Sequence, residues 1–254
     1  MGWTFTAACG CHRGNYRANN EDNFFFEGKC LEQIHDTLPN PVPWEGAVKT
    51  GLCMAVFDGV GGANFGEVAS FVAARTLQQT QRSMADFFVA ERNYLRRLTG
   101  QMNLAVVEAA RERNTALMGS TMVALYFSGR SVYLCNVGDS RGYRLRDGVL
   151  SQISKDHTQP IPGKPGKNGI TQYLGMDPEE IAIDPYIAKG ELRHDDVYLI
   201  CSDGVTDMLS NFEIADILLG QEDPEEAVRQ IVDGALARGG RDNITVIVCR
   251  IKQA

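Results

Sequence analysis

Carboxylates stand at the ends of apolar, strand-like segments along this 254-residue chain. Four aspartates and one acidic pair share this placement: Asp58, Asp139, Asp203, Asp242 and Glu21-Asp22. If these strand ends point the same way, their carboxylates gather at one rim, where like charges cannot all stay ionised without compensation. A hard cation provides that compensation. Oxygen-only ligands indicate magnesium, manganese or calcium rather than zinc.

Glycine adjoins three of these acids, in Asp58-Gly59, Gly138-Asp139 and Asp203-Gly204. Glycine permits tight turns and lets a backbone carbonyl approach a metal. At any single position, Asp-Gly can equally be an ordinary turn dipeptide. The prediction of a metal site therefore depends on several such acids occurring together at strand ends. The segment Cys9-Gly10-Cys11-His12 resembles half of a zinc site, but no second Cys/His cluster of suitable spacing follows it.

The composition excludes several classes of protein. Hydrophobic residues make up 44% and charged residues 22%, as in soluble globular domains. The formal charge of −7 argues against nucleic-acid and membrane partners. No segment reaches the ~18 apolar residues of a membrane helix, and no signal peptide is visible. The seven scattered cysteines are typical of reduced thiols, so we expect a cytoplasmic location.

The elements that must position the acids alternate in blocks. Strand-like runs cover 3–9, 23–26 and 52–57, and apolar stripes at helical spacing follow over 68–77 and 95–109. Next comes a β-rich stretch with an Asp147-Gly148 hairpin turn. Two helices follow, and Ser210/Glu213 and Asp223-Pro224 are typical of their N-termini. A last strand covers 243–251. This order predicts antiparallel sheets packed against helix pairs in a single domain, 1–254, with an insertion loop over 28–50.

Short motifs in a fixed order run through nearly the whole chain. They are Arg17-x-x-x-Glu21-Asp22, Phe57-Asp58-Gly59-Val60-Gly61-Gly62, Gly119-Ser120-Thr121, Asn136-Val137-Gly138-Asp139-Ser140-Arg141, Asp156-His157-Thr158, Ser202-Asp203-Gly204-x-x-Asp207 and Arg241-Asp242-Asn243-Ile244-Thr245. With this ordered set the chain resembles the metal-dependent serine/threonine protein phosphatases of the PPM, or type 2C, class. Val60 within Asp-Gly-x-Gly-Gly looks more like bacterial than animal members.

The resemblance implies a four-layer α-β-β-α sandwich, an α+β fold of two antiparallel sheets flanked by helix pairs, with a dinuclear Mn²⁺/Mg²⁺ site at one end. Asp58 would bridge both metals and the Gly59 carbonyl would bind one, with Glu21 on the same side. Asp203 and Asp242 would hold the other metal, and Asp139 with Asp203 a weaker third. Arg17 would bind the phosphate. Asp22 and Asn243 would support these ligands. Asp22 fits a turn residue equally well.

The implied reaction is hydrolysis of phosphoserine and phosphothreonine in proteins by a metal-bridging hydroxide. We expect substrates phosphorylated by a Ser/Thr kinase, a signalling role and a monomeric enzyme. Two alternatives stay open: a pseudophosphatase that only binds, and a phosphatase dedicated to an anti-sigma-factor antagonist. Loss of the bridging aspartate would favour the first, and Asp58 is present. The presence of Arg17 argues against the second.

Two departures from the family pattern bear on the chemistry. Many animal relatives carry histidine where this chain has Val60, so another group must protonate the leaving alcohol; His12 is one candidate. The segment 159–169 is a shortened flap rich in proline and glycine. We expect an irregular connector there, with Lys164 and Lys167 near the rim of the site.

Overall fold

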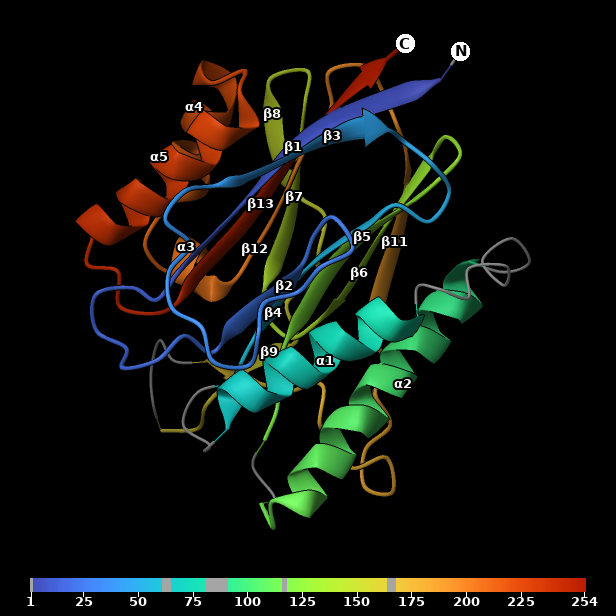
Figure 1. Ribbon diagram of the computed structural model, residues 1–254, viewed down its shortest axis with the longest axis vertical. Helices are drawn as coiled ribbons and strands as arrows, with labels where there is room; N and C mark the ends of the chain where they lie inside the picture. The colour runs from blue at the N-terminus through green and yellow to red at the C-terminus, as the bar shows by residue number, and fades with distance from the viewer. Residues whose placement is uncertain (1, 61–64, 81–90, 116–117, 164–167) are drawn as a thin grey trace.

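Two antiparallel sheets packed face to face form the centre of the fold, and helices cover their outer faces (Figure 1). The computed structural model describes residues 2–60, 65–80, 91–115, 118–163 and 168–254. In Figure 1, α4 and α5 lie on one side of the sandwich and α1 and α2 on the other. The expected four-layer arrangement of two sheets between helix pairs is therefore confirmed.

The first sheet has six strands in the order β3-β1-β13-β12-β7-β8. Its strands are β1 (Trp3–His12), β3 (Val42–Ala47), β7 (Arg141–Arg146), β8 (Val149–Gln152), β12 (Val197–Cys201) and β13 (Ile244–Gln253). The first and last strands of the chain, β1 and β13, pair along ten residues at its centre. This long pairing closes the domain by joining the two ends of the sequence.

The second sheet has five strands in the order β11-β6-β5-β4-β2. They are β2 (Asp22–Phe25), β4 (Cys53–Asp58), β5 (Met122–Ser128), β6 (Ser131–Val137) and β11 (Tyr186–Glu191). Strands β4, β5 and β6 are buried almost throughout. They therefore read as continuous apolar runs rather than as alternating patterns.

The helices divide between the two outer faces. They are α1 (Gly66–Thr80), α2 (Glu91–Glu112), the short α3 (Asp203–Thr206), α4 (Asn211–Gly220) and α5 (Pro224–Ala237). One apolar cluster joins α1 and α2 to the five-stranded sheet, a second fills the space between the sheets, and a third joins α4 and α5 to the six-stranded sheet. Three separate cores thus hold the four layers together.

Local signals in the sequence account for the element ends. Ser210 and Glu213 form the expected capping box at α4, and Asp223 caps α5 with Pro224 at its first position. Asp147 and Gly148 both have positive φ, as a two-residue hairpin turn between β7 and β8 requires. These turns fix the register of the strands that lead to the acidic residues.

The segment 28–50, expected to be an insertion loop, contains strand β3. This strand pairs with β1 from Thr4↔Ala47 to Cys9↔Val42. Its Pro43 lies on an edge strand, where a missing N–H donor can be tolerated. Proline and the lack of a continuous apolar run concealed this strand in the sequence.

The expected irregular connector over 159–169 is in part a small hairpin. Strand β9 (Thr158–Pro160) pairs with β10 (Asn168–Ile170), and the two form a sheet of their own. Lys164 and Lys167, expected at the rim of the site, lie outside the described residues.

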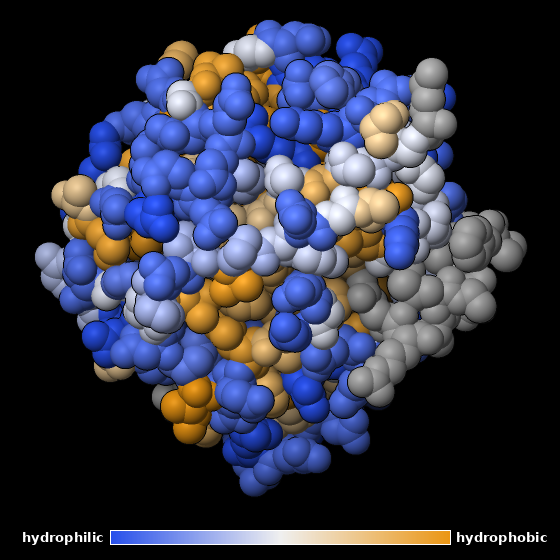
Figure 2. Space-filling model, turned by 45° about the horizontal axis from the view of Figure 1, so that its top comes forward, coloured by the Kyte–Doolittle hydropathy of each residue, from blue (hydrophilic) through white to orange (hydrophobic). Residues whose placement is uncertain are grey.

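The surface in Figure 2 is mostly hydrophilic, with apolar side chains grouped near the centre of that face. Apolar side chains at a protein surface are normal when they occur in small groups. Within the described residues, no helix combines the length and the apolar character needed to cross a membrane.

Candidate active site

The strand register brings the predicted acids to one end of both sheets. In the five-stranded sheet, Asp22 of β2 lies directly opposite Asp58 of β4. The neighbouring pair Met122↔Val137 places the end of β6, and therefore Asp139, at the same edge. In the six-stranded sheet, Cys201↔Val246 sets the end of β12 beside the start of β13. Asp203 follows β12 and Asp242 precedes β13, so these two acids share that end.

A buried hydrogen bond connects the two sheets at this end. The Ser202 hydroxyl donates to Oδ2 of Asp22 over 2.7 Å, and the Thr245 N–H donates to Ser202 Oγ over 2.9 Å. Asp22 is buried, and its other oxygen, Oδ1, has no hydrogen-bond partner among the described residues. Burial raises the pKa of Asp22 to about 7, while hydrogen bonds from Thr245 and Ser202 oppose the shift.

The pKa shifts of these acids indicate that their carboxylates lie near one another. Burial, and next the charge of Asp203, raise the pKa of Asp58 well above its ordinary value. Burial, and next the charge of Asp139, raise the pKa of Asp203 to about 8. Asp242 contributes to both shifts. Carboxylates this close repel one another when ionised, so their ionised state is unfavourable. A bound cation relieves the repulsion.

The donor set fits a hard divalent cation. All the gathered groups are carboxylates, and Asp139 has a buried oxygen, Oδ1, with no hydrogen-bond partner among the described residues. As placed, no three His, Cys, Asp or Glu side chains within the described ranges form a group that could hold a metal ion. Oxygen ligands of this kind suit Mg²⁺ or Mn²⁺.

Glycine at position 59 is required by close backbone packing. A Cβ there would lie 2.5 Å from the carbonyl oxygen of Gly66 and 2.7 Å from that of Glu21. The Gly59 N–H donates to the Glu21 carbonyl over 3.1 Å. Glu21 is half-buried, and burial raises its pKa, while Arg17 opposes the shift. The chain thus holds Gly59 beside Glu21 at the start of α1.

Arg17 contacts this acidic group directly. Its Nη2 atom lies 2.5 Å from Oδ2 of Asp242, and both side chains are partly exposed. The hydrogen bond to Asp242 raises the pKa of Arg17, and Glu21 and Asp58 also act on its charge. The guanidinium therefore stands at the edge of the acidic group and is partly exposed.

Asn243 ties together the segments that carry Glu21 and Asp242. Its Nδ2 donates to the carbonyls of Arg13 and Asn19 over 2.8 and 3.0 Å, and its Oδ1 accepts from the Glu21 N–H over 2.8 Å. Its own N–H donates to Oδ1 of Asp242 over 2.8 Å. These contacts join Asn243 to the segments of Glu21 and Asp242, and its role in supporting metal ligands stays a prediction.

Asp139 stands in a turn that His157 holds. Gly138 has φ of 97°, and its N–H donates to Nδ1 of His157 over 3.2 Å. The His157 N–H donates back to the Gly138 carbonyl over 2.9 Å. Burial lowers the pKa of His157, which keeps Nδ1 free to accept. His157 thus holds the turn next to Asp139 by two hydrogen bonds.

Several contacts at the site were not anticipated from the sequence. Ser202 joins Asp22, and Thr121 donates its N–H to the Asp58 carbonyl over 2.8 Å. The Thr121 hydroxyl oxygen, Oγ1, also lies 2.6 Å from the Ser140 hydroxyl oxygen, Oγ. These residues belong to the motifs identified in the sequence. Their hydrogen bonds connect segments far apart in the sequence, so the spacing of nearby residues could not predict them.

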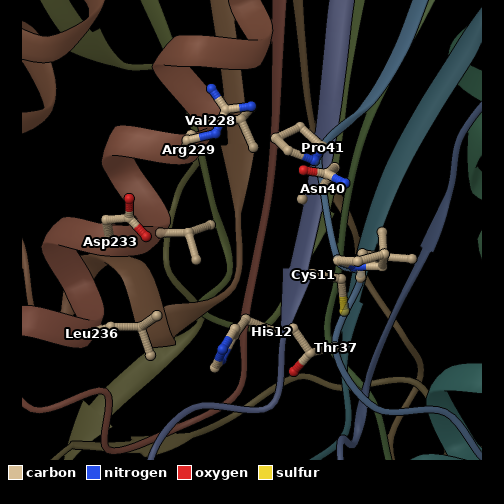
Figure 3. Close-up of a pocket in the computed structure, with 13 residues that line it drawn as sticks. Cys11, His12, Thr37, Asn40, Pro41, Val228, Arg229, Asp233 and Leu236 are labelled. Carbon is tan, nitrogen blue, oxygen red and sulfur yellow. The ribbon is translucent and has the colours of Figure 1, made fainter.

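His12, the candidate proton donor, faces a different cavity. A hollow of about 330 Å³ lies between α5, β1 and the segment 37–41. Figure 3 shows the His12 side chain between Leu236 of α5 and Thr37, with Asp233 across the cavity. Nδ1 of His12 accepts from the Gly14 N–H over 2.8 Å. Burial lowers its pKa, and the charges of Asp36, Arg13 and Asp233 also act on it. A role for His12 in the reaction stays a prediction.

Comparison with known proteins gives one consistent result. The family model described as Protein phosphatase 2C matches residues 42–233. The serine/threonine phosphatase stp of Listeria welshimeri is 30% identical over 253 residues, which is 93% of this chain and 92% of that protein.

Solved structures agree. The crystal structure of the serine/threonine phosphatase PstP/Ppp of Mycobacterium tuberculosis has a TM-score of 0.77 at 29% identity, covering 98% of this chain and 100% of that one. The PstP catalytic domain in complex with two manganese ions has a TM-score of 0.76 at 29% identity, covering 99% and 100%. With its fold and acidic residues so arranged, the chain belongs to the protein phosphatase 2C family.

Proposed function

We infer that the chain is a metal-dependent protein phosphatase that hydrolyses phosphoserine and phosphothreonine in protein substrates. The gathering of Asp58, Asp139, Asp203 and Asp242 at one end of both sheets, with Arg17 beside Asp242, carries this conclusion. Its relatives bear the name serine/threonine phosphatase, and one similar structure holds two manganese ions. We therefore take Mn²⁺ or Mg²⁺ as the cofactor.

We propose the following metal ligands. Asp58 would contribute to both cations, together with the Gly59 carbonyl and Glu21 at one of them. Asp203 and Asp242 would hold the second cation, and Asp139 with Asp203 would hold a weaker third. When bound, the cations provide a nucleophile derived from water and stabilise in-line displacement at phosphorus.

The remaining chemistry belongs to the protein itself. Arg17 binds and orients the phosphate, a task that suits its planar set of N–H donors. Val60 carries no proton for the leaving alcohol. A cysteine nucleophile is disfavoured because burial raises the thiol pKa of Cys9, Cys11 and Cys201, and a buried thiol is a poor nucleophile.

We further propose that the enzyme acts in the cytoplasm, as a monomer, on substrates of a Ser/Thr kinase. All seven cysteines are free, as expected in a reducing compartment. A pseudophosphatase is not favoured, because the acids and the residues that position them are all present.

The test is hydrolysis of a phosphothreonine peptide with and without Mn²⁺. We expect turnover with the metal, loss of turnover with excess chelator, and recovery when Mn²⁺ is restored. Asp58→Asn should abolish turnover, whereas Asp147→Asn, which alters an aspartate in the exposed β7–β8 turn, should have no effect. Full activity in excess chelator would contradict the proposal.

A further inference from the structure

A cationic pocket lies at the edge of the five-stranded sheet, next to the turn that carries Asp139. It is a cavity of about 430 Å³ between the first turns of α2 and the start of β11. Its charged lining residues are Arg92, Arg96, Lys155 and Asp184, and Gln172 and Tyr186 also face it. In Figure 1, α2 and β11 lie on the same side of the sandwich.

The pocket carries uncompensated positive charge. Nη1 of Arg96 lies 2.5 Å from Oδ1 of Asp184, which accounts for the one carboxylate. No described residue forms an ion pair with Arg92 or Lys155, and both are exposed. His157 also lines the cavity, and burial lowers its pKa, so it adds no charge near neutral pH. In a chain of formal charge −7, this local excess attracts anions.

The pocket is built on rigid parts of the fold. Lys155 is held by its backbone, since its carbonyl accepts from Nδ2 of Asn136 over 2.9 Å and its N–H donates to Oδ1 of the same residue over 3.3 Å. Tyr186 lies opposite Asn136 in the pairing of β11 with β6. Lys155 therefore projects from a fixed backbone position beside the end of β6 that leads to Asp139.

The strand register gives the distance from this pocket to the reaction site. Tyr186, Asn136, Val123 and Val56 form one row across four neighbouring strands. Three steps of ~4.8 Å put Tyr186 about 14 Å from Val56 of β4, and Asp58 lies two residues further along that strand, so the backbone separation from the pocket to Asp58 is about 16 Å. An extended peptide covers about 16 Å with four to five residues, at ~3.3 Å each. Asp139 and its turn lie between the two sites.

We propose that this pocket binds an anionic group of the phosphoprotein substrate, a carboxylate or a second phosphate, four to five residues from the phosphorylated residue. The inference rests on the proposed phosphatase function. The exposed cations suit the side chains of a peptide that passes over the surface, rather than an enclosed small molecule. Attraction at such a site acts on substrate capture, so it raises kcat/KM and weakens with salt.

The test uses the Mn²⁺-loaded enzyme and phosphothreonine peptides that differ at one position. At the fifth residue before or after the phosphothreonine, the peptides carry Gln, Glu or a non-hydrolysable phosphonate analogue of phosphoserine. We expect kcat/KM to be roughly two- to tenfold higher for the anionic peptides than for the Gln peptide, on one side of the phosphothreonine. The comparison of Glu with phosphonate distinguishes the two anions. The preference should diminish as salt is raised.

The double variant Arg92→Gln/Lys155→Gln should lose this preference, so that the ratio between anionic and Gln peptides approaches one. The matched double variant Arg130→Gln/Lys252→Gln removes two exposed cations elsewhere and should keep it. If wild type hydrolyses all peptides equally, or if the Arg92/Lys155 variant keeps the preference, the pocket proposal is wrong while the phosphatase function stands. No Mn²⁺-dependent hydrolysis of any peptide would overturn both.

Discussion

The guanidinium of Arg17 lies 2.5 Å, Nη2 to Oδ2, from the carboxylate of Asp242. This contact joins the residue proposed to bind phosphate to one proposed to bind metal. A guanidinium has five N–H donors, so the bond to Asp242 leaves others for a phosphate oxygen. In the proposed mechanism, this pair of residues would bring the substrate and the cation to adjacent atoms.

Replacement of Arg17 should mainly weaken substrate binding. A charged hydrogen bond is worth roughly 1.5–3 kcal/mol, so Arg17→Ala should raise KM for a phosphothreonine peptide by about ten- to a hundredfold. Its effect on kcat should be small, because the contact exists in the ground and transition states alike. Arg130→Ala, on an exposed hairpin turn, serves as control. An unchanged KM with a large fall in kcat would show that Arg17 acts only in the transition state.

The acidic group should lower the stability of the metal-free protein. Burial and Asp139 raise the pKa of Asp203 from 3.8 to about 8, so the folded state binds more protons than the unfolded state between these values. The stability therefore falls as pH rises through this window. Asp203→Asn removes the ionisation and should stabilise the metal-free protein at pH 8, by about 1–3 kcal/mol or roughly 2–12 °C in Tm.

Thermal unfolding in excess chelator, followed from pH 4 to 8, measures this effect. The advantage of Asp203→Asn should be close to zero at pH 4 and largest at pH 8. Mn²⁺ should reverse it, because wild type gains stability from the metal and the variant gains less. Asp147→Asn, on a side chain 84% exposed, should follow wild type throughout. A variant less stable than wild type at pH 8 without metal would refute the repulsion.

The sequence predicted the parts of the fold that depend on near neighbours. The capping box at Ser210 and the turn at Asp147-Gly148 are encoded within four residues, and both are present. The acids were found by the same means, because each adjoins an apolar run that becomes a strand. Their meeting at one end follows from antiparallel pairing, which the block order of elements indicated.

Contacts between distant segments could not be predicted from patterns of neighbouring residues. Ser202 and Asp22 are 180 positions apart, and their hydrogen bond depends on how two sheets are packed. Strand β3 was missed because its register with β1 comes from a partner more than thirty residues away. The cationic pocket was missed for the same reason. Its members come from α2, the 155–157 segment and β11, and each alone is an ordinary surface residue.

Asn243 should prove important for both stability and metal binding. It is buried, and Asn243→Ala would leave the Glu21 N–H and the carbonyls of Arg13 and Asn19 without their partner. Each orphaned group costs about 1–3 kcal/mol if it stays buried, so we expect a loss of roughly 2–4 kcal/mol.

Chelator-free denaturant unfolding and manganese titration measure the two effects. The metal affinity should fall as well, because Glu21 and Asp242 lose their common support. Asn40→Ala, at an exposed position, is the control and should change neither quantity. A stable Asn243→Ala variant with unaltered manganese affinity would show that the loops hold their positions independently.

Val60 offers a test of how the leaving alcohol obtains its proton. Its N–H donates to the Gly119 carbonyl over 3.0 Å, and its half-buried side chain directly follows Asp58-Gly59. General-acid help is typically worth 10²–10⁴-fold, and aryl phosphates need it less than phosphoserine does. Val60→His should therefore speed hydrolysis of a phosphoserine peptide more than that of an aryl phosphate.

The gain from Val60→His requires a protonated imidazole, so it should be larger at pH 6 than at pH 8, across the ordinary histidine pKa of ~6.5. Val60→Gln, polar but without a proton to donate at these pH values, should give no such difference. The measurement is kcat for both substrates across this pH range. Equal acceleration of both substrates, or a loss confined to the peptide, would mean that position 60 does not reach the leaving oxygen. The proton must then come from a different group of the site.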